Sequence, residues 1–164
     1  DFLANVGQAW EAEARKAETY GIYVSRLRIG VVLAAGGGAL GAMLLPFKLG
    51  LGGALGSGQQ WWSWIHRDDL VGIVSNLLEN TYSGAVNGVS PSPVTQKEFA
   101  RILGRVVSRP AFLPAPEFAL RLILGGFATE LLSSKRVLPE RAKQVGYTFH
   151  YPDLENALID ALYK

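Results

Sequence analysis

Hydrophobic residues recur at every fourth position at the start of the chain, in a stripe formed by Phe2, Val6, Trp10 and Ala14. This spacing predicts an amphipathic helix over residues 1–19, with Asp1 as its N-cap. Gly21 ends the pattern, and an almost uncharged, β-branched run follows from Ile22 to Leu33. A short apolar run of this kind after a helix predicts a buried strand of a parallel sheet.

The middle of the chain predicts two more strands around a helix. Residues 61–66 and 85–89 are short apolar runs, and between them Asp68 or Asp69 can cap a helix. The apolar face of that helix would consist of Leu70, Val71, Ile73, Val74, Leu77 and Leu78.

The last third of the chain is predicted to be mostly helical. Thr95-Gln96-Lys97-Glu98 is a capping box that opens a helix through Phe99, Ile102 and Leu103. Prolines precede three further apolar-periodic stretches, at Pro116, Pro139 and Pro152. Proline is favoured in the first turn of a helix, so each of these prolines predicts a helix start.

Residues 36–58 are rich in glycine, which permits positive φ angles and close backbone approach at an entropic cost. We expect a flexible loop here. The competing interpretation is a transmembrane helix, because Ile29–Phe47 carries no charge and contains Gly37-x-x-x-Gly41. A triple glycine, Pro46 and Lys48 argue against such a span.

Composition narrows the classes of function. Hydrophobic residues make up 49% of the chain and charged residues 18%, so either much of the surface is expected to be buried against something else or part of it is expected to meet lipid. The net charge is only +2, and the basic residues are dispersed, so no nucleic-acid partner is expected. The chain has no cysteine and two histidines, His66 and His150, so no metal site is expected.

An ordered series of motifs resembles one family. The series begins with Leu27–Leu33, the loop from Gly36 to Gly53, and Gly56-Ser57-Gly58-Gln59-Gln60, and it continues through Ser63-Trp64-Ile65-His66-Arg67-Asp68-Asp69-Leu70, Val86-Asn87-Gly88, Arg109-Pro110 and Val137-Leu138-Pro139. Together these motifs are similar to an atypical subgroup of the extended short-chain dehydrogenase/reductases. That subgroup is NAD(P)-dependent epimerase/dehydratase-like and was formerly described as cell-division-inhibitor-like.

The resemblance implies an α/β fold that is the C-terminal part of a Rossmann-like protein about twice this length. It assigns 1–33 to the last helix and strand region of the sheet and 34–60 to a glycine-rich lid. It assigns 61–89 to a returning strand-helix-strand unit and 90–164 to a helical substrate-side lobe. The Gly-x-x-Gly-x-x-Gly turn that seats a dinucleotide pyrophosphate has no counterpart in this sequence.

The resemblance also implies where a cofactor would lie. Gly30, Val31 and Val32 would line the nicotinamide end of an NADP groove. Aligning Glu11 with the family's helix places Leu3 and Gly7 at the positions of a catalytic Tyr-x-x-x-Lys pair. Neither residue can transfer a proton, so the sequence identifies no catalytic residue.

Each of the three substrate-side candidates could instead have a purely structural role. Arg28, near the carboxyl end of a strand, either meets a ligand or pairs with a carboxylate on an adjacent loop. His66 either carries a proton or is structural. Trp64, with its neighbours Trp61 and Trp62, either stacks on a ring or packs in the core or lid.

Asp68 and Asp69 form a carboxylate pair in one interpretation and cap a helix in the other.

Two functional hypotheses follow from these features. The first is a partial chain of an NADP-dependent oxidoreductase or epimerase-like protein, partnered by its missing N-terminal Rossmann half. The second is a non-catalytic structural or regulatory subunit of a larger assembly, which retains the reductase fold. A membrane protein spanning at residues 29–47 is a third alternative. The expected location is the cytoplasm or the interior of a plastid or other organelle.

Overall fold

The computed structural model describes residues 2–34 and 36–163, so the predicted N-cap Asp1 lies outside the described residues. The chain begins with α1 (Phe2–Lys16), and a 3-10 turn η1 (Ala17–Tyr20) continues it. Gly21 then adopts a left-handed conformation with φ 76°, which glycine tolerates without strain. The predicted first helix and its end are therefore confirmed.

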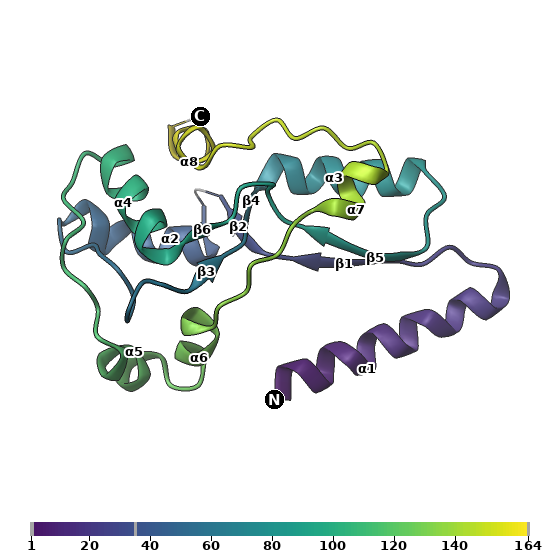
Figure 1. Ribbon diagram of the computed structural model, residues 1–164, viewed down its shortest axis with the longest axis horizontal. Coiled ribbons are helices and arrows are strands. Elements are labelled where there is room, and N and C mark those ends of the chain that lie inside the picture. The colour runs from purple at the N-terminus through teal and green to yellow at the C-terminus, as the bar shows by residue number, and fades with distance from the viewer. Residues whose placement is uncertain (1, 35, 164) are drawn as a thin grey trace.

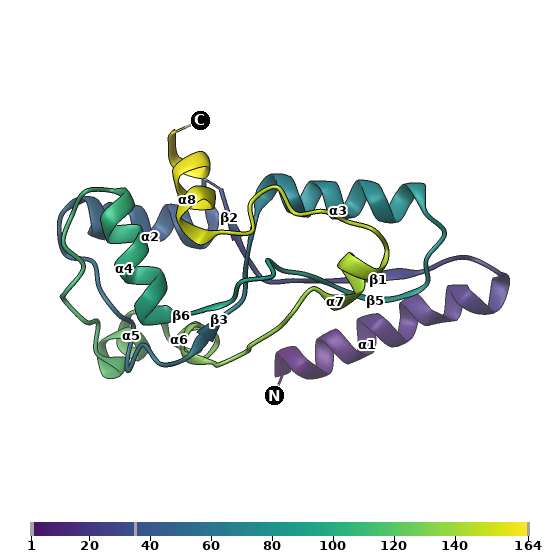
Figure 2. The ribbon, with the colours of Figure 1, turned by 45° about the horizontal axis from the view of Figure 1, so that its top comes forward.

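The strand β1 (Ser25–Ile29) runs back along α1 and pairs in parallel with β5 (Gly84–Gly88). Figures 1 and 2 show three layers at this end of the molecule, with α1 on one side of the two strands and α3 (Arg67–Glu79) on the other. The short helix α7 (Glu140–Gln144) also packs on β5. The predicted parallel α/β arrangement is confirmed.

The predicted strand over residues 22–33 is divided in two at Gly30. Beyond Gly30, β2 (Val31–Leu33) leaves β5 and pairs in parallel with β4 (Trp64–His66). The Gly30 amide still donates to the Gly88 carbonyl at 3.1 Å, whereas the Val31 amide donates to the Ser63 carbonyl at 2.9 Å. We call this change of partner the strand fork.

Only glycine fits at the strand fork. A Cβ atom on Gly30 would lie 2.3 Å from the Ser63 carbonyl oxygen and 2.8 Å from Cγ1 of Val89. Carbon atoms do not approach backbone oxygens so closely, so the missing side chain is what lets the two strand pairs meet.

The predicted strand over 61–66 is also interrupted. Its first part, β3 (Trp61–Trp62), pairs antiparallel with β6 (Val94–Thr95), and its second part is β4. β6 leads directly into α4 (Gln96–Val106), whose N-cap Thr95 accepts a hydrogen bond from the Glu98 amide at 3.3 Å. The predicted cap is thus confirmed, while the Glu98 carboxylate pairs with Arg101.

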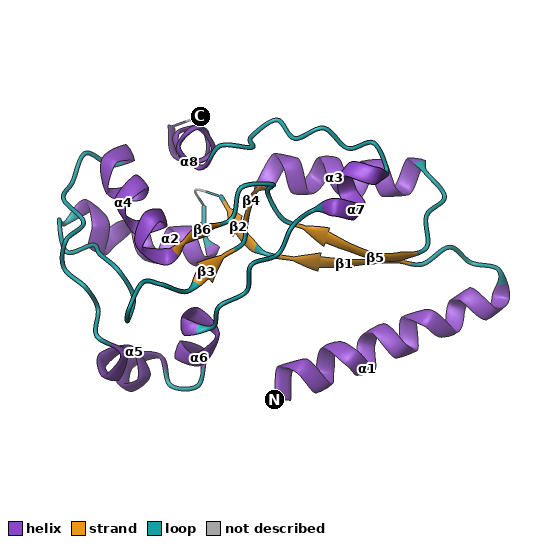
Figure 3. Cartoon of the chain, in the orientation of Figure 1, coloured by secondary structure: helices purple, strands orange, loops and turns teal. Residues whose placement is uncertain are grey.

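The helical lobe gathers around β3, β4 and β6 (Figure 3). It contains α4, α5 (Glu117–Leu124), α6 (Phe127–Leu132) and α8 (Leu154–Tyr163). Its core includes Trp62, Trp64, Phe99, Leu103 and Leu158. A separate cluster of Ile65, Ile73, Val86 and Ala142 joins α3 and α7 to β4 and β5.

The glycine-rich segment is more ordered than a loop, because it contains α2 (Gly38–Lys48). Leu40 and Phe47 are buried on one side of α2 and add to the core of the helical lobe, so packing overrides the low helix propensity of glycine. Across the described residues, no helix combines the length and apolar character needed to cross a membrane.

Candidate functional site

A cavity of about 1000 Å³ opens at the strand fork, beside the carboxyl ends of β1 and β5. In open parallel sheets, ligands bind at this edge, in the crevice where neighbouring strands diverge. Residues from the ends of β1 and β5, from β2 and β3, and from the segment 130–137 line the cavity. Its walls therefore come from both the sheet and the helical lobe.

The predicted cofactor residues Gly30, Val31 and Val32 all line this cavity. Ile29 and Val89 add apolar surface, and Asn87 lies at the carboxyl end of β5. The Asn87 side-chain amide donates to the Leu138 carbonyl at 3.1 Å, which fixes its orientation. An apolar wall with a few fixed polar groups is typical of a small-molecule site.

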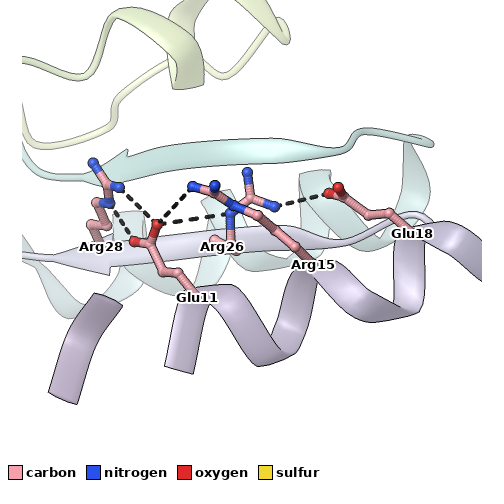
Figure 4. Close-up of polar contacts among 5 residues, drawn as sticks. All are labelled: Glu11, Arg15, Glu18, Arg26 and Arg28. Carbon is pink, nitrogen blue, oxygen red and sulfur yellow. Dashed lines mark hydrogen bonds and ion pairs between the residues drawn. The ribbon is translucent and has the colours of Figure 1, made fainter. Parts of the chain in front are cut away.

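Arg28 lines the cavity and also pairs with a carboxylate (Figure 4). Its Nε lies 2.6 Å from Oε1 of Glu11, and a second guanidinium nitrogen lies 2.8 Å from Oε2. This bidentate pair of hydrogen bonds lowers the pKa of Glu11 and raises the pKa of Arg28. The alternative of an ion pair holds, although its carboxylate comes from helix α1 rather than from a loop.

The same ionic cluster attaches α1 to β1. Arg26 of β1 lies 2.8 Å from the Glu18 carboxylate in η1, and Arg15 lies 3.7 Å from Glu11 (Figure 4). Trp10 and Leu3 on the same helix are 74% and 54% exposed. Charge pairs from Glu11 and Glu18 therefore connect the C-terminal half of α1 and the turn η1 to β1.

Leu3 and Gly7 precede Glu11 by two turns and one turn of α1. Residues four apart lie on one helix face, and α1 runs antiparallel to β1 (Figure 1). The row through Glu11, Gly7 and Leu3 therefore continues toward the carboxyl end of β1, where the cavity opens. Neither Leu3 nor Gly7 brings an ionisable group to this end of the helix.

His66 lies away from the cavity and is 1% exposed. Its Nδ1 accepts a hydrogen bond from the Asp68 amide at 3.2 Å, so His66 is the N-cap of α3. Nε2 faces the Asp160 carboxylate at 3.5 Å, and the ring stacks on Tyr151 with centroids 3.9 Å apart. Burial lowers the pKa of His66, which favours the neutral ring that the cap requires.

The imidazole of His66 also belongs to a group that could hold a metal, because ligand atoms of His66, Asp68 and Asp160 lie within 4.8 Å of one another. With Nδ1 accepting the Asp68 amide, the proton of the neutral ring is on Nε2. A ring in this tautomer offers no lone pair toward Asp160. The geometry therefore favours a helix cap over a metal ligand.

Trp64 is fully buried in the core, and its indole N–H donates to the Ser92 carbonyl at 2.9 Å. The cavity is instead lined by Trp61 and Trp62. Trp62 packs on Phe99 in the core, with ring centroids 5.2 Å apart. The guanidinium of Arg136 lies over the Trp61 ring, with its central carbon 4.8 Å from the ring centroid.

Asp68 and Asp69 are neither a carboxylate pair in the cavity nor the cap of α3, whose N-cap His66 lies two or three residues earlier than predicted. Asp68 pairs with Arg67 at the surface. Asp69 is completely buried and accepts hydrogen bonds from the Tyr147 hydroxyl and from the amides of His150 and Tyr151, at 2.8–2.9 Å. It thereby ties the loop before α8 to the start of α3.

The segment from Glu130 to Val137 contributes cavity residues that the sequence interpretation missed. Glu130, Lys135 and Arg136 supply charged groups, and Ser63, between β3 and β4, also lines the cavity. The available signal was the pair Lys135-Arg136, two consecutive cations directly before the motif Val137-Leu138-Pro139. No periodicity links this pair to the strands 70 residues earlier, so only the fold brings them together.

Comparisons with known proteins agree with this architecture. Residues 115–161 match the model of a domain of unknown function, DUF1731. The chain is 48% identical over 159 residues to the epimerase family protein SDR39U1 homolog, chloroplastic, of Arabidopsis thaliana, and covers 46% of it. It is 46% identical to epimerase family protein SDR39U1 of Homo sapiens and covers 54% of it. These matches include 96% of this chain in both cases.

Solved structures show the same fold. A crystal structure of human epimerase family protein SDR39U1 (isoform 2) with NADPH has a TM-score of 0.82 and 44% identity, covering 85% of this chain and 48% of that chain. A nucleoside-diphosphate sugar epimerase from Corynebacterium glutamicum has a TM-score of 0.77 and 31% identity, covering 99% of this chain and 31% of that one.

The chain spans about half the length of the curated relatives that it matches. It matches both the helical lobe and the adjoining strands of an extended reductase fold. The chain thus matches the C-terminal portion of extended short-chain dehydrogenase/reductases, among the epimerase family proteins that include SDR39U1.

Proposed function

We propose that this chain forms the substrate-side lobe and the last parallel strands of an NADP-dependent oxidoreductase or epimerase-like protein. The observation that carries the proposal is the strand fork at Gly30, which opens into the cavity at the carboxyl ends of β1 and β5. Ligands of open α/β folds bind at such an edge. A related human protein has been crystallised with NADPH, which supports the choice of cofactor.

The residues around the fork suit one end of this cofactor. Ile29, Val31 and Val89 offer apolar surface to a flat ring, and Gly30 leaves its backbone uncovered by a side chain. The sequence has no glycine-rich turn for the pyrophosphate, so the remaining contacts belong to the missing N-terminal Rossmann half. That half is the partner we propose for this chain.

A bound nicotinamide would supply hydride transfer. The residues of this chain would place the reacting ring against Gly30, Val31 and Val32, and the helical lobe would cover the substrate. Glu130 is the one carboxylic acid among the described residues that line the cavity, and Lys135 pairs with it at 2.9 Å. Leu3 and Gly7 leave the proton-transfer step of ordinary members without its usual carrier.

NADPH titration of the full-length protein, followed by fluorescence, tests the proposal. Val31→Phe should weaken NADPH binding at least about tenfold, because the larger side chain occupies space beside the ring, while Val71→Phe on the exposed face of α3 should not. Thermal unfolding checks that both variants fold. Unchanged affinity in Val31→Phe, or tight NADPH binding by residues 1–164 alone, would contradict the proposal.

A non-catalytic structural or regulatory subunit is the second candidate. It is favoured by Leu3 and Gly7 at the aligned catalytic positions and by Trp10, which is 74% exposed on the same helix. The discriminating measurement is whether the isolated chain runs as a monomer or is recovered only with partners. Recovery as a free monomer would remove the support for this candidate.

For its location we propose the cytoplasm or the interior of a plastid or other organelle. The name of the Arabidopsis relative, which includes the word chloroplastic, supports the second of these. Fractionation of cells that carry a tagged full-length protein would decide between them.

A further inference from the structure

We propose that the substrate of this cavity carries an anionic oxygen group, a carboxylate or a phosphate, and that Arg136 binds it. The inference rests on the proposed function, because it names the substrate class of the same cavity. It depends on where the cationic side chains of the cavity lie and on which of them already have a carboxylate partner.

Three cationic side chains line the cavity: Arg28, Lys135 and Arg136. Arg28 is held by Glu11 through two hydrogen bonds, and Lys135 lies 2.9 Å from the Glu130 carboxylate. For Arg136, the described part of the chain places no carboxylate oxygen within 4.0 Å. Arg136 is therefore the cation of this cavity whose charge a ligand would balance.

The guanidinium of Arg136 has a defined position. Its central carbon lies 4.8 Å from the centre of the Trp61 ring, which is a cation–π contact. Such stacking engages the face of the guanidinium and leaves the N–H groups at its edge available to an acceptor. An arginine oriented in this way loses less side-chain freedom when it binds a carboxylate or phosphate.

Hydrogen bonds fix the backbone around Arg136 to strand β3 and to Ser63. The Lys135 amide donates to the Trp61 carbonyl at 3.2 Å, and the Trp61 amide donates to the Ser134 hydroxyl at 3.1 Å. The Ser63 hydroxyl donates to the Lys135 carbonyl at 2.8 Å and accepts from the Val137 amide at 2.9 Å. Bonds on both sides of Arg136 thus hold it at the cavity rather than on a free loop.

Ser63 links this anion site to the strand fork. Its carbonyl accepts the Val31 amide, while its hydroxyl holds residues 135 and 137. One residue therefore sets the separation between the wall proposed for the nicotinamide and the side chain proposed for the substrate anion. Ser63 is a positioning residue in this scheme and does not touch the ligand.

The test uses the indole N–H signal of Trp61 in the NMR spectrum of the full-length protein, assigned through Trp61→Phe. Inorganic phosphate and succinate are titrated separately at constant ionic strength, first without and then with NADPH. We expect a saturable shift of the Trp61 signal with at least one of the two anions. Saturation by phosphate alone, by succinate alone, or by both identifies which source of the anionic group fits.

Two variants decide whether Arg136 is responsible. Arg136→Gln should raise the dissociation constant of the effective anion at least about tenfold, as expected for the loss of a charge-assisted hydrogen bond. The matched control is Arg15→Gln, an exposed arginine of α1 that does not line the cavity, and it should leave the constant unchanged.

A linear, non-saturating response to both anions, or equal dissociation constants in Arg136→Gln and the parent, would overturn the inference. If the full-length parent protein binds the anion but does not bind NADPH, the proposed function is refuted and this inference still stands.

Discussion

At the scale of single residues, the buried carboxylate of Asp69 connects two distant parts of the chain through three hydrogen bonds. Its two oxygens accept three hydrogen bonds from a loop about 80 positions later in the chain, and its side chain is fully buried. The sequence presents Asp69 as one of two adjacent aspartates and gives no sign of this difference. Burial and partners, which only the fold supplies, separate it from Asp68.

Replacing Asp69 with Asn should destabilise the protein by roughly 2–4 kcal/mol, because an amide NH₂ group would face backbone donors that the carboxylate now satisfies. Asp68→Asn, at the exposed neighbour, should cost less than about 1 kcal/mol. Urea unfolding followed by circular dichroism measures both values. Equal losses in the two variants would show that the buried bonds contribute little.

The buried imidazole of His66 should make stability depend on pH. Burial lowers its pKa in the folded state below the usual value of 6.5, so the unfolded chain takes up the proton first. The contribution of His66 is therefore complete above about pH 6.5 and is lost as the pH falls toward the folded-state pKa.

Urea unfolding at pH 7.5 and at pH 5.5 measures this loss. His66→Asn keeps a side chain that can cap α3 but does not titrate, so the difference between the two pH values should shrink in this variant. A difference as large as in the parent protein would assign the pH dependence to other groups.

At the scale of secondary-structure elements, hydrophobic patterning predicted which segments become helices and strands but not where the strands divide. The helices at α1, α3, α4 and α8 and the presence of buried strands at β1 and β5 follow from the apolar pattern, whereas the pairing of β1 with β5 does not. The breaks at Gly30 and Ser63 come from tertiary contacts between distant strands, which no local pattern encodes. Helix α2 was missed because its glycines disfavour a helix unless buried neighbours support it.

Two glycines of these elements should respond in opposite directions to substitution by alanine. Gly30→Ala should destabilise the protein by at least about 3 kcal/mol, because its Cβ would meet a backbone oxygen that cannot move without breaking the strand pairs. Gly41→Ala in α2 should stabilise it by about 0.5–1 kcal/mol, because its Cβ meets nothing within 4 Å and alanine favours the helix.

Thermal unfolding of the two alanine variants, followed by circular dichroism, shows whether each substitution raises or lowers the stability. A midpoint for Gly30→Ala at or above that of the parent would refute the packing argument at the strand fork.

At the scale of the whole molecule, the N-terminal end exposes a strand edge and aromatic side chains. In the described chain, β1 pairs with β5 alone, so its other edge has no strand partner, and Trp10 and Tyr23 beside it are 74% and 65% exposed. The apolar composition predicted that some surface would be buried against something else or would meet lipid. The sequence could not say which surface, because the apolar stripe of α1 looks the same whether it faces its own sheet or a partner.

We expect the isolated chain to self-associate through this end, since open strand edges and exposed aromatic side chains favour intermolecular contacts. Sedimentation equilibrium should give a mass above 17.7 kDa that rises with concentration. Trp10→Lys should return the mass toward that of the monomer, whereas Leu122→Lys, at an even more exposed position on α5, should not. Identical behaviour of both variants would place the association elsewhere.

The strand fork also bears on how fast this chain folds. The continuous backbone from Ser25 to Leu33 forms two parallel pairings, one with β5 and one with β4. Both pairings require the closure of long stretches of chain. Such non-local pairings slow the folding of small proteins, because the entropy of loop closure is lost before contacts compensate for it. Since the two pairings share one backbone, a register error in either would displace the other, and we expect them to form together in a single late kinetic step.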